Sequence, residues 1–188
     1  MLWSCLNFHL SMDVTRNCQS NGLYWHEPSD SFLFSFYTTN TVVEIDHQTG
    51  ETLQIWGELS PDWGFSPEES AFAWQHGVSF TDAGTLLLSS MTELGPEAFE
   101  TVAREYEIDG EAQLLREVWS FGSGEGIYAV TAGDAERLSN GNTLHNYGSA
   151  GRIREVAPSG ELVWELDWAA EHLLGRAFFI PDLYPLAP

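Results

Sequence analysis

A four-strand pattern recurs three times along this chain of 188 residues and constrains the fold more than any other feature. Within each copy, short strand-like runs are joined by turns such as Asp109-Gly110 and Asn140-Gly141, where the backbone needs the positive φ that these residues tolerate. Each fourth strand follows a Gly-Glu step and contains a tryptophan. The steps are Gly50-Glu51, Gly110-Glu111 and Gly160-Glu161, and the tryptophans are Trp56, Trp119 and Trp164.

The repeat predicts twelve short antiparallel strands. The first unit comprises 22–25, 32–37, 41–46 and 52–57, the second 77–80, 85–90, 101–108 and 114–121, and the third 135–138, 143–147, 152–156 and 162–168. The first strands end at Trp25, Phe80 and Leu138, which lie 55 and 58 positions apart. Four-stranded units at this spacing are typical of β-propeller blades. We therefore expect an all-β fold of about three four-stranded antiparallel blades.

We predict a segment of unclear structure over 1–16, followed by a propeller region over 17–188. Its parts are blades at 17–57, 74–122 and 133–168, long loops at 58–70, 92–100 and 123–131, and a closing segment at 169–188 with a short helix (169–174) and a last strand (176–184). The third strands should supply the packing between blades through Val42, Ile45, Val102, Tyr106, Ile153 and Val156. Three blades cannot close a ring, which takes about four. The chain is a fragment, half of an oligomeric ring or an open arc, and we favour the fragment.

The charge of the chain excludes two classes of partner. Asp and Glu number 28 against seven Arg and no Lys, which gives a formal net charge of −21. Such a surface repels phosphate backbones and anionic lipid, so we expect neither a nucleic-acid nor a membrane partner. Adaptation to a salty environment and selection for solubility would each explain the excess of acidic residues.

The cysteines and the polar motifs indicate no metal or cofactor. Cys5 and Cys18 match no metal-binding spacing, and either a disulfide or two free thiols fits the sequence. No phosphate loop, Ser/His/Asp pattern or calcium-loop spacing appears. No run reaches the roughly 18 apolar residues of a spanning helix. The apolar start, 1–12, lacks the basic residues and cleavage site of a convincing signal peptide.

Three stretches carry a resemblance to a known family. They are NTVVEIDHQTGETLQIWG (40–57), WQHGVSFTDAGTLLLSS (74–90) and AERLSNGNTLHNYGSAGRIREVAPSGELVWELDW (135–168). The chain from about Gln19 to Tyr184 resembles the C-terminal half of the arylsulfotransferase family. The resemblance implies part of a six-bladed propeller in a bacterial periplasmic or secreted enzyme. Such enzymes move a sulfuryl group from a phenolic sulfate ester to another phenol through a transiently sulfated histidine, without a nucleotide sulfate donor.

The resemblance assigns roles residue by residue. The nucleophilic histidine of the family falls in the step Trp74-Gln75-His76, so it maps to His76. A His-x-Asn step of the family matches Gln19-Ser20-Asn21, where the Asn is kept and the His is not. An Arg that follows Ser-Ser in a second strand is replaced by Tyr37. A further active-site histidine would lie outside this chain.

The replacements at Gln19 and Tyr37 matter for catalysis. The transition state of sulfuryl transfer carries negative charge on the sulfonate oxygens, and cationic hydrogen-bond donors stabilise that charge. A neutral imidazole can act as the nucleophile, and a second imidazole would protonate the leaving phenolate. Gln19 cannot supply that proton, and Tyr37 carries no positive charge. Losing one such donor costs about 10²–10³ in rate. We therefore expect a weak or lost activity.

Each candidate residue also has a structural interpretation. His76 is either a residual nucleophile or a histidine hydrogen-bonded at a strand start. Gln75 and Asn21 fit a role as caps of strand ends better than a role in binding. Arg176 supplies positive charge to the site or forms a surface ion pair. We expect structural roles for four further groups. His145 packs inside its strand, Asp134 caps a turn and the three tryptophans belong to the core. The remaining histidines lie on the surface or in turns: His9, His26, His47 and His172.

Two functions follow. The first is a divergent arylsulfotransferase-like protein with His76 as catalytic residue and Asn21, Gln19, Tyr37, Gln75 and Arg176 around the substrate, an aryl sulfate or phenol. It needs no cofactor. The second is a non-catalytic propeller module or truncated fragment. Either can require a second copy or a missing N-terminal half to complete the ring.

Overall fold

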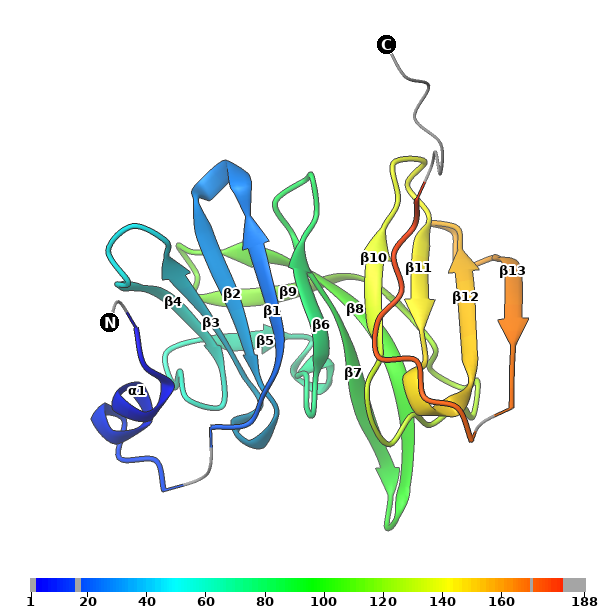
Figure 1. Ribbon diagram of the computed structural model, residues 1–188, viewed down its shortest axis with the longest axis horizontal. Coiled ribbons are helices and arrows are strands. Elements are labelled where there is room, and N and C mark those ends of the chain that lie inside the picture. Colours follow the sequence, from blue (N-terminus) through cyan, green and yellow to red (C-terminus); the bar gives the residue numbers. More distant parts are fainter. Residues whose placement is uncertain (1–2, 16–17, 170, 181–188) are drawn as a thin grey trace.

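The computed structural model describes residues 3–15, 18–169 and 171–180. It contains three sheets, antiparallel except for one parallel pair in the second, that follow one another along the chain and stand side by side (Figure 1). One strand of each sheet, here called its innermost strand, lies next to the others: β1 (Ser20–His26), β6 (His76–Phe80) and β10 (Asp134–Arg137). Strand β6 contacts both β1 and β10. This is the blade arrangement of a β-propeller. Among the described residues, no helix has the length and apolar character needed to cross a membrane.

The first sheet is a four-stranded meander in the order β1-β2-β3-β4. Its strands are β1 (Ser20–His26), β2 (Ser31–Phe36), β3 (Thr41–Asp46) and β4 (Thr52–Gly57). The turn into β4 is held by the Asp46 carboxylate, which accepts the backbone N–H groups of Gln48 and Thr49 at 2.9 and 2.6 Å. The third and fourth strands match the predicted ranges.

The second sheet has five strands in the order β5-β9-β8-β7-β6. These are β5 (Gly64–Ser66), β6 (His76–Phe80), β7 (Leu86–Gly95), β8 (Ala98–Asp109) and β9 (Leu114–Phe121). Strand β5 pairs in parallel with β9 and lies in a stretch that we predicted to be loop. The predicted loop 92–100 is also wrong, because β7 and β8 continue pairing as far as Gly95 and Ala98. Acidic residues interrupt the alternation of apolar and polar residues in this stretch, so the sequence pattern does not indicate the long hairpin.

The third sheet repeats the four-stranded order as β10-β11-β12-β13. Its strands are β10 (Asp134–Arg137), β11 (Thr143–Asn146), β12 (Arg152–Val156) and β13 (Leu162–Asp167). After β13 the predicted helix over 169–174 is absent from the described residues, and 176–180 forms no strand. The rest of the predicted last strand, 181–184, lies outside the described residues.

Apolar side chains fill the space between neighbouring sheets. Leu33, Val42 and Trp56 of the first sheet pack against residues of the second that include Leu88 and Tyr106. A smaller cluster joins the second and third sheets through Leu87, Ala103 and Ala135. Packing between sheets is confirmed for Val42 and Tyr106, which belong to the cluster between the first two sheets. The prediction is wrong for Ile45, which packs with Phe8, and for Ile153, which packs with Trp168 and Leu174. All six predicted residues are buried: Val42, Ile45, Val102, Tyr106, Ile153 and Val156.

The outer face of the first sheet is covered by a short helix, α1 (Cys5–Ser11), within the segment that the sequence left uninterpreted. Phe8 of α1 and the nearby Trp3 pack on Phe36 of the sheet. A disulfide between Cys5 and Cys18, which the sequence left open, ties the helix to the chain just before β1. His9 was predicted to lie on the surface, but it is buried because α1 turns it toward Phe36.

The outer face of the third sheet, in contrast, is only partly covered. Trp168, Leu174 and Ala177 pack against the cluster that contains Leu144 and Ile153, but β13 stays exposed along its length. The prediction that all three tryptophans are core residues is therefore wrong for Trp164, which is 41% exposed, whereas Trp56 is buried. Trp119 is half-buried beneath the guanidinium of Arg137. A tryptophan at this repeat position is buried only where another sheet packs on it.

Candidate functional site

A pocket of about 290 Å³ lies where the three innermost strands begin. Each strand contributes one polar residue at or next to its first position: Asn21 from β1, His76 from β6 and Asp134 from β10. Arg176, from the segment after the third sheet, lines the same pocket. The remaining lining residues are Gly22, Gly77, Ala132, Gly133 and Gly175. The pocket therefore combines an imidazole, an amide, a carboxyl group and a guanidinium group.

Gly77 allows β6 and β10 to approach closely at the pocket. A Cβ atom at this position would lie 2.2 Å from the Cβ atom of Asp134, and the backbone there has a φ of +58°. Only glycine combines this conformation with this lack of side-chain volume. The sequence step His76-Gly77 therefore places the imidazole beside the start of the third sheet.

The imidazole of His76 is oriented by Asn21. The Asn21 Nδ2 atom lies 2.6 Å from the Gln75 carbonyl oxygen and 3.1 Å from His76 Nδ1. The first contact fixes the amide, because the opposite orientation would set two oxygen atoms against each other. The second hydrogen of the amide then points to His76, so Nδ1 accepts and the proton of the neutral ring resides on Nε2.

Nε2 of His76 is buried and has no hydrogen-bond partner within the described part of the chain. Burial lowers the pKa of His76 from its ordinary value, so the ring favours its neutral form. The ring of Tyr37 lies 5.9 Å from that of His76, centroid to centroid. A neutral imidazole is the form that a nucleophile requires, and it can also donate one hydrogen bond.

Gln75 lies behind the pocket. Its side chain is completely buried, and Nε2 donates to Ser35 Oγ at 3.1 Å and to the Thr41 carbonyl oxygen at 3.1 Å. These bonds join β6 to the second and third strands of the first sheet. Gln75 thus links the sheets by hydrogen bonds, and its carbonyl oxygen also sets the orientation of Asn21.

Asp134 and Arg176 form the charged side of the pocket. Arg176 Nε lies 3.4 Å from Asp134 Oδ2, and the same oxygen accepts the backbone N–H of Ala177 at 3.3 Å. Burial raises the pKa of the Asp134 carboxyl group to about 6, against the opposing effects of hydrogen bonds and of Arg176. The Arg176 side chain is 40% exposed and lies over the ring of Phe178, at 4.7 Å. The ion pair expected for Arg176 is therefore present, and it lies at the pocket.

The two positions where the chain departs from the family pattern lie at the first sheet. Gln19 precedes β1 and is exposed, and its carbonyl oxygen accepts the backbone N–H of Tyr37 at 3.0 Å. Tyr37 reaches the neighbourhood of His76 with its ring, whereas neither residue lines the pocket itself. The structure thus brings together His76, Asn21 and Arg176, with Tyr37 beside them, and leaves Gln19 at the margin.

Sequence reasoning understated Asp134, which we interpreted as a turn cap. Its signal was its position directly before the first strand of the third blade, which matches Asn21 and His76 in the other two. Asp134 and Arg176 also line an adjoining pocket of about 180 Å³. That pocket carries the rings of Tyr24, Phe80 and Phe178. Asp82, Glu136 and Arg137 line the same pocket, so aromatic and charged side chains lie together next to the first pocket.

Comparison with known proteins gives two kinds of match. The sequence profile of the arylsulfotransferase (ASST) family matches residues 24–169. Among solved structures, a protein of unknown function from Bacteroides caccae matches with 14% identity and a TM-score of 0.52, over 83% of this chain and 48% of that chain. The PQQ-bound aldose sugar dehydrogenase of Streptomyces coelicolor matches with 16% identity and a TM-score of 0.50, over 78% and 47%. No curated protein matches.

At these identities the structural matches show the fold alone, and the chain spans about half the length of each matched structure. The family match is of a different kind, because it covers most of the chain, including all three innermost strands apart from the start of β1. The chain belongs to the arylsulfotransferase (ASST) family.

Proposed function

We propose that the pocket binds the sulfate group of an aryl sulfate and that His76 accepts its sulfuryl group slowly. The observation that carries this proposal is the pairing of a neutral, oriented imidazole with the Arg176 guanidinium group in one pocket. A sulfate monoester keeps its negative charge throughout the physiological pH range, so a guanidinium group is a suitable ligand for it. The amide of Asn21 holds the ring in place.

The adjoining pocket supports an aromatic substrate. Tyr24, Phe80 and Phe178 line it, and Arg176 and Asp134 belong to both pockets. A phenolic ring bonded to the sulfate would then rest on aromatic side chains, which favour offset-stacked and edge-to-face contacts. These rings favour an aryl sulfate over an inorganic or alkyl sulfate, and Asp82 and Glu136 in the same lining disfavour a second negative group on the substrate.

Transfer to His76 has a definite proton requirement. The S–O bond of the ester breaks, an N–S bond forms, and the phenolate leaves with the bonding electron pair and takes a proton. Attack through Nε2 requires the ring proton on Nδ1, and the Asn21 amide must then turn so that Oδ1 accepts it. That rotation removes the 2.6 Å hydrogen bond to the Gln75 carbonyl oxygen. This cost is one reason to expect slow transfer.

The departures from the family pattern at Gln19 and Tyr37 are the second reason to expect slow sulfuryl transfer. An Arg at position 37 would place its charge near the His76 ring, from which Tyr37 lies 5.9 Å away. A His at position 19 would supply the proton that the leaving phenolate needs. With neither group present, Arg176 is the one guanidinium among the described residues that line the pocket.

A second candidate is a non-catalytic binding module. The observation in its favour is the Nε2 atom of His76, which is buried and carries the ring proton in the geometry set by Asn21. A protonated Nε2 is a hydrogen-bond donor and not a nucleophile. In this alternative the pocket holds a sulfate ester without reacting with it.

Turnover of a chromogenic aryl sulfate with a phenol acceptor separates the two candidates. We expect the double substitution Gln19→His/Tyr37→Arg to raise the rate by about 10²–10³, as restored transition-state donors do. Adding His76→Ala should abolish the gain, whereas His172→Ala, at an exposed histidine after the third sheet, should leave it intact. Restored variants that fold, as judged by circular dichroism and urea unfolding, but show no turnover would favour the binding module.

A further inference from the structure

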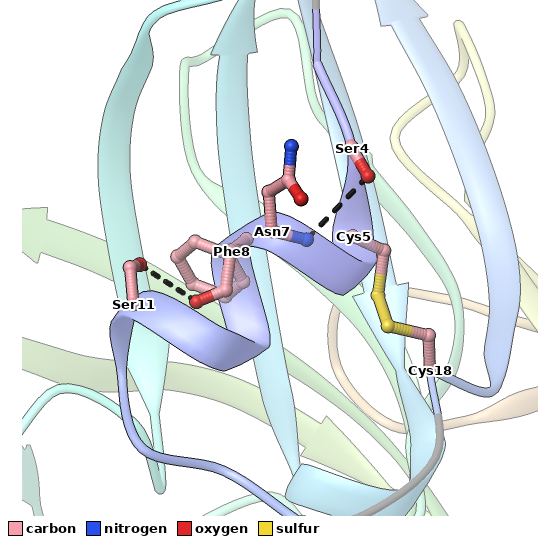
Figure 2. The surroundings of a disulfide bond; sticks show 6 residues. All are labelled: Ser4, Cys5, Asn7, Phe8, Ser11 and Cys18. Carbon is pink, nitrogen blue, oxygen red and sulfur yellow. Dashed lines mark hydrogen bonds between the residues drawn. A yellow bond between two sulfur atoms is a disulfide. The ribbon is translucent and has the colours of Figure 1, made fainter.

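Three metal-binding side chains meet on the helix that covers the first sheet. Cys5 and His9 stand four residues apart in α1, so they lie on one face of the helix. Cys18 returns to this face and is joined to Cys5 (Figure 2). The two sulfur atoms and a ring nitrogen of His9 all lie within 4.8 Å of one another. Sequence spacing missed this group because the histidine was predicted to lie on the surface.

We propose that reduction of the Cys5–Cys18 disulfide converts this group into a zinc site with Cys5, His9 and Cys18 as ligands. Thiolate and imidazole are the ligands that Zn²⁺ takes most often in structural sites. Soft sulfur donors also favour Zn²⁺ over the hard cations Mg²⁺ and Ca²⁺. The proposal is independent of the function proposed for His76, because the site lies on the outer face of the first sheet.

The geometry requires only small movements. With Zn–S bonds of about 2.3 Å at tetrahedral angles, the two sulfur atoms must separate to about 3.8 Å. The Cα atoms of Cys5 and Cys18 are 6.1 Å apart, which leaves both side chains able to reach one ion. A Zn–N bond of about 2.0 Å places the nitrogen about 3.5 Å from each sulfur. The distances between the His9 nitrogen and the two sulfur atoms, which are at most 4.8 Å, therefore need to contract by about 1 Å.

The surroundings hold one ligand firmly and leave room for the ion. His9 is 2% exposed, and its ring packs against that of Phe36 at a centroid distance of 5.6 Å. A pocket of about 370 Å³ adjoins the group and is lined by His9, Cys18 and Asp13 among other residues. The fourth coordination position can face this pocket, where the Asp13 carboxylate or a water molecule would complete a tetrahedron.

The chemistry balances with a dithiol reductant. The reductant donates two electrons and two protons, the S–S bond breaks, and two cysteine thiols form while the reductant becomes a disulfide. Zinc then binds the two thiolates and the neutral imidazole, and two protons are released to solvent. The helix α1 thus remains attached near β1 in both states, by the disulfide under oxidising conditions and by the ion under reducing conditions.

Binding of Co²⁺ as a spectroscopic probe tests the site. We expect the reduced chain to bind one Co²⁺ with thiolate-to-cobalt charge-transfer bands and the visible bands of a tetrahedral site, and equimolar Zn²⁺ to displace it. The oxidised chain, with its disulfide intact, should show neither set of bands. His9→Gln should weaken Co²⁺ and Zn²⁺ binding at least about 100-fold, since even indirect partners of a metal ligand contribute 10–100-fold.

Two variants guard against loss of structure as an explanation. His47→Gln changes an exposed histidine on the turn of the same sheet and should keep the affinity of the parent chain. Cys18→Ser should lose the charge-transfer intensity of one thiolate while unfolding in urea as the reduced parent does. The proposal is overturned if reduced parent chain shows no thiolate bands, or if His9→Gln binds Zn²⁺ as tightly as His47→Gln.

Discussion

Two histidines at the junctions between sheets illustrate how the same side chain takes different roles. His76 joins the first and second sheets through Asn21, and His145 joins the second and third through Ser89, whose Oγ lies 3.0 Å from His145 Nε2. His145 is completely buried, and its ring lies 3.9 Å from that of Tyr147. His76 is only partly buried and lines a pocket.

The difference follows from what surrounds each ring. Burial lowers the pKa of His145 to about 3, with the charge of Arg154 acting in the same direction. The His145 side chain is fully buried between the second and third sheets, so its environment suits packing. The His76 ring has the same preference for the neutral form but stands beside Arg176 and Asp134 in a pocket. A buried neutral histidine indicates reactivity only where space and charge lie next to it.

The largest expected effect is on stability, at His145. His145→Ala removes a buried ring and leaves the Ser89 hydroxyl without its partner, which should lower the free energy of unfolding by about 3 kcal/mol. His76→Ala, at a partly buried position beside a pocket, should cost about 1 kcal/mol. Urea unfolding of both variants at pH 7 measures the contrast. An equal loss of unfolding free energy in the two variants would show that the two rings contribute equally to stability, which would contradict the expected contrast.

The pH dependence of the same variants sharpens the contrast. With a folded pKa of about 3, His145 binds a proton in the unfolded chain first, so the parent loses stability as pH falls below about 6.5. His145→Ala lacks this loss. The stability difference between parent and variant should therefore shrink by about 2 kcal/mol between pH 7 and pH 5. A difference that stays constant would show that His145 is not a buried neutral ring.

The next expected effect is on binding in the pocket. The pKa of Asp134, raised to about 6, means that its carboxylate offsets the charge of Arg176 at pH 7.5 but much less at pH 5.5. An aryl sulfate keeps its charge over this range, so its Kd should fall about 3- to 10-fold as pH falls from 7.5 to 5.5. Isothermal titration calorimetry measures this change.

The variant Asp134→Asn is the control for this dependence of Kd on pH. The variant keeps a hydrogen-bonding group of similar size, so it should bind tightly at both pH values. Protonation of His76 would also strengthen binding at low pH, and the residual slope of Asp134→Asn measures that contribution. A slope unchanged by the substitution would assign the pH dependence to His76 and remove Asp134 from the account of the pocket.

The smallest expected effect concerns a single proton. Asn21 donates to His76 Nδ1, so the imidazole ¹⁵N spectrum of His76 should show a protonated Nε2 and an unprotonated Nδ1. Asn21→Ala removes this bias and should move the two shifts toward averaged values. A protonated Nδ1 in the parent chain would mean that the Asn21 amide takes the opposite orientation, and Nε2 would then be free to attack.

Most of the fold could be predicted from the sequence because it lies in local repetition. Turn residues, alternating strands and the Gly-Glu step located every strand of the three meanders, and several boundaries agree with the structure. The sequence could not predict that α1 covers the outer face of the first sheet while the outer face of the third sheet stays largely exposed. Whether Trp56 or Trp164 is buried depends on what packs outside each sheet, and α1 has no repeat from which to infer it.

The site was predictable only where the family resemblance reached it. His76 and Asn21 lie together as their matched positions imply, and Arg176 joins them although 100 residues separate it from His76. The proximity of Asp134 to β6 depends on Gly77, and the orientation of His76 depends on a carbonyl oxygen of the preceding residue. The glycine at position 77 is compatible with a close approach but does not identify Asp134 as its partner, and the Gln75 carbonyl contact has no signature in residue type.

The most direct test of the proposed activity is an intact-mass spectrum of the folded chain after exposure to a chromogenic aryl sulfate. We expect a sulfuryl adduct on a fraction of the protein, mapped to His76 by fragmentation, absent in His76→Ala and discharged by added phenol. Folded protein that binds the aryl sulfate by calorimetry but gains no mass would contradict transfer through His76 and leave the pocket as a binding site.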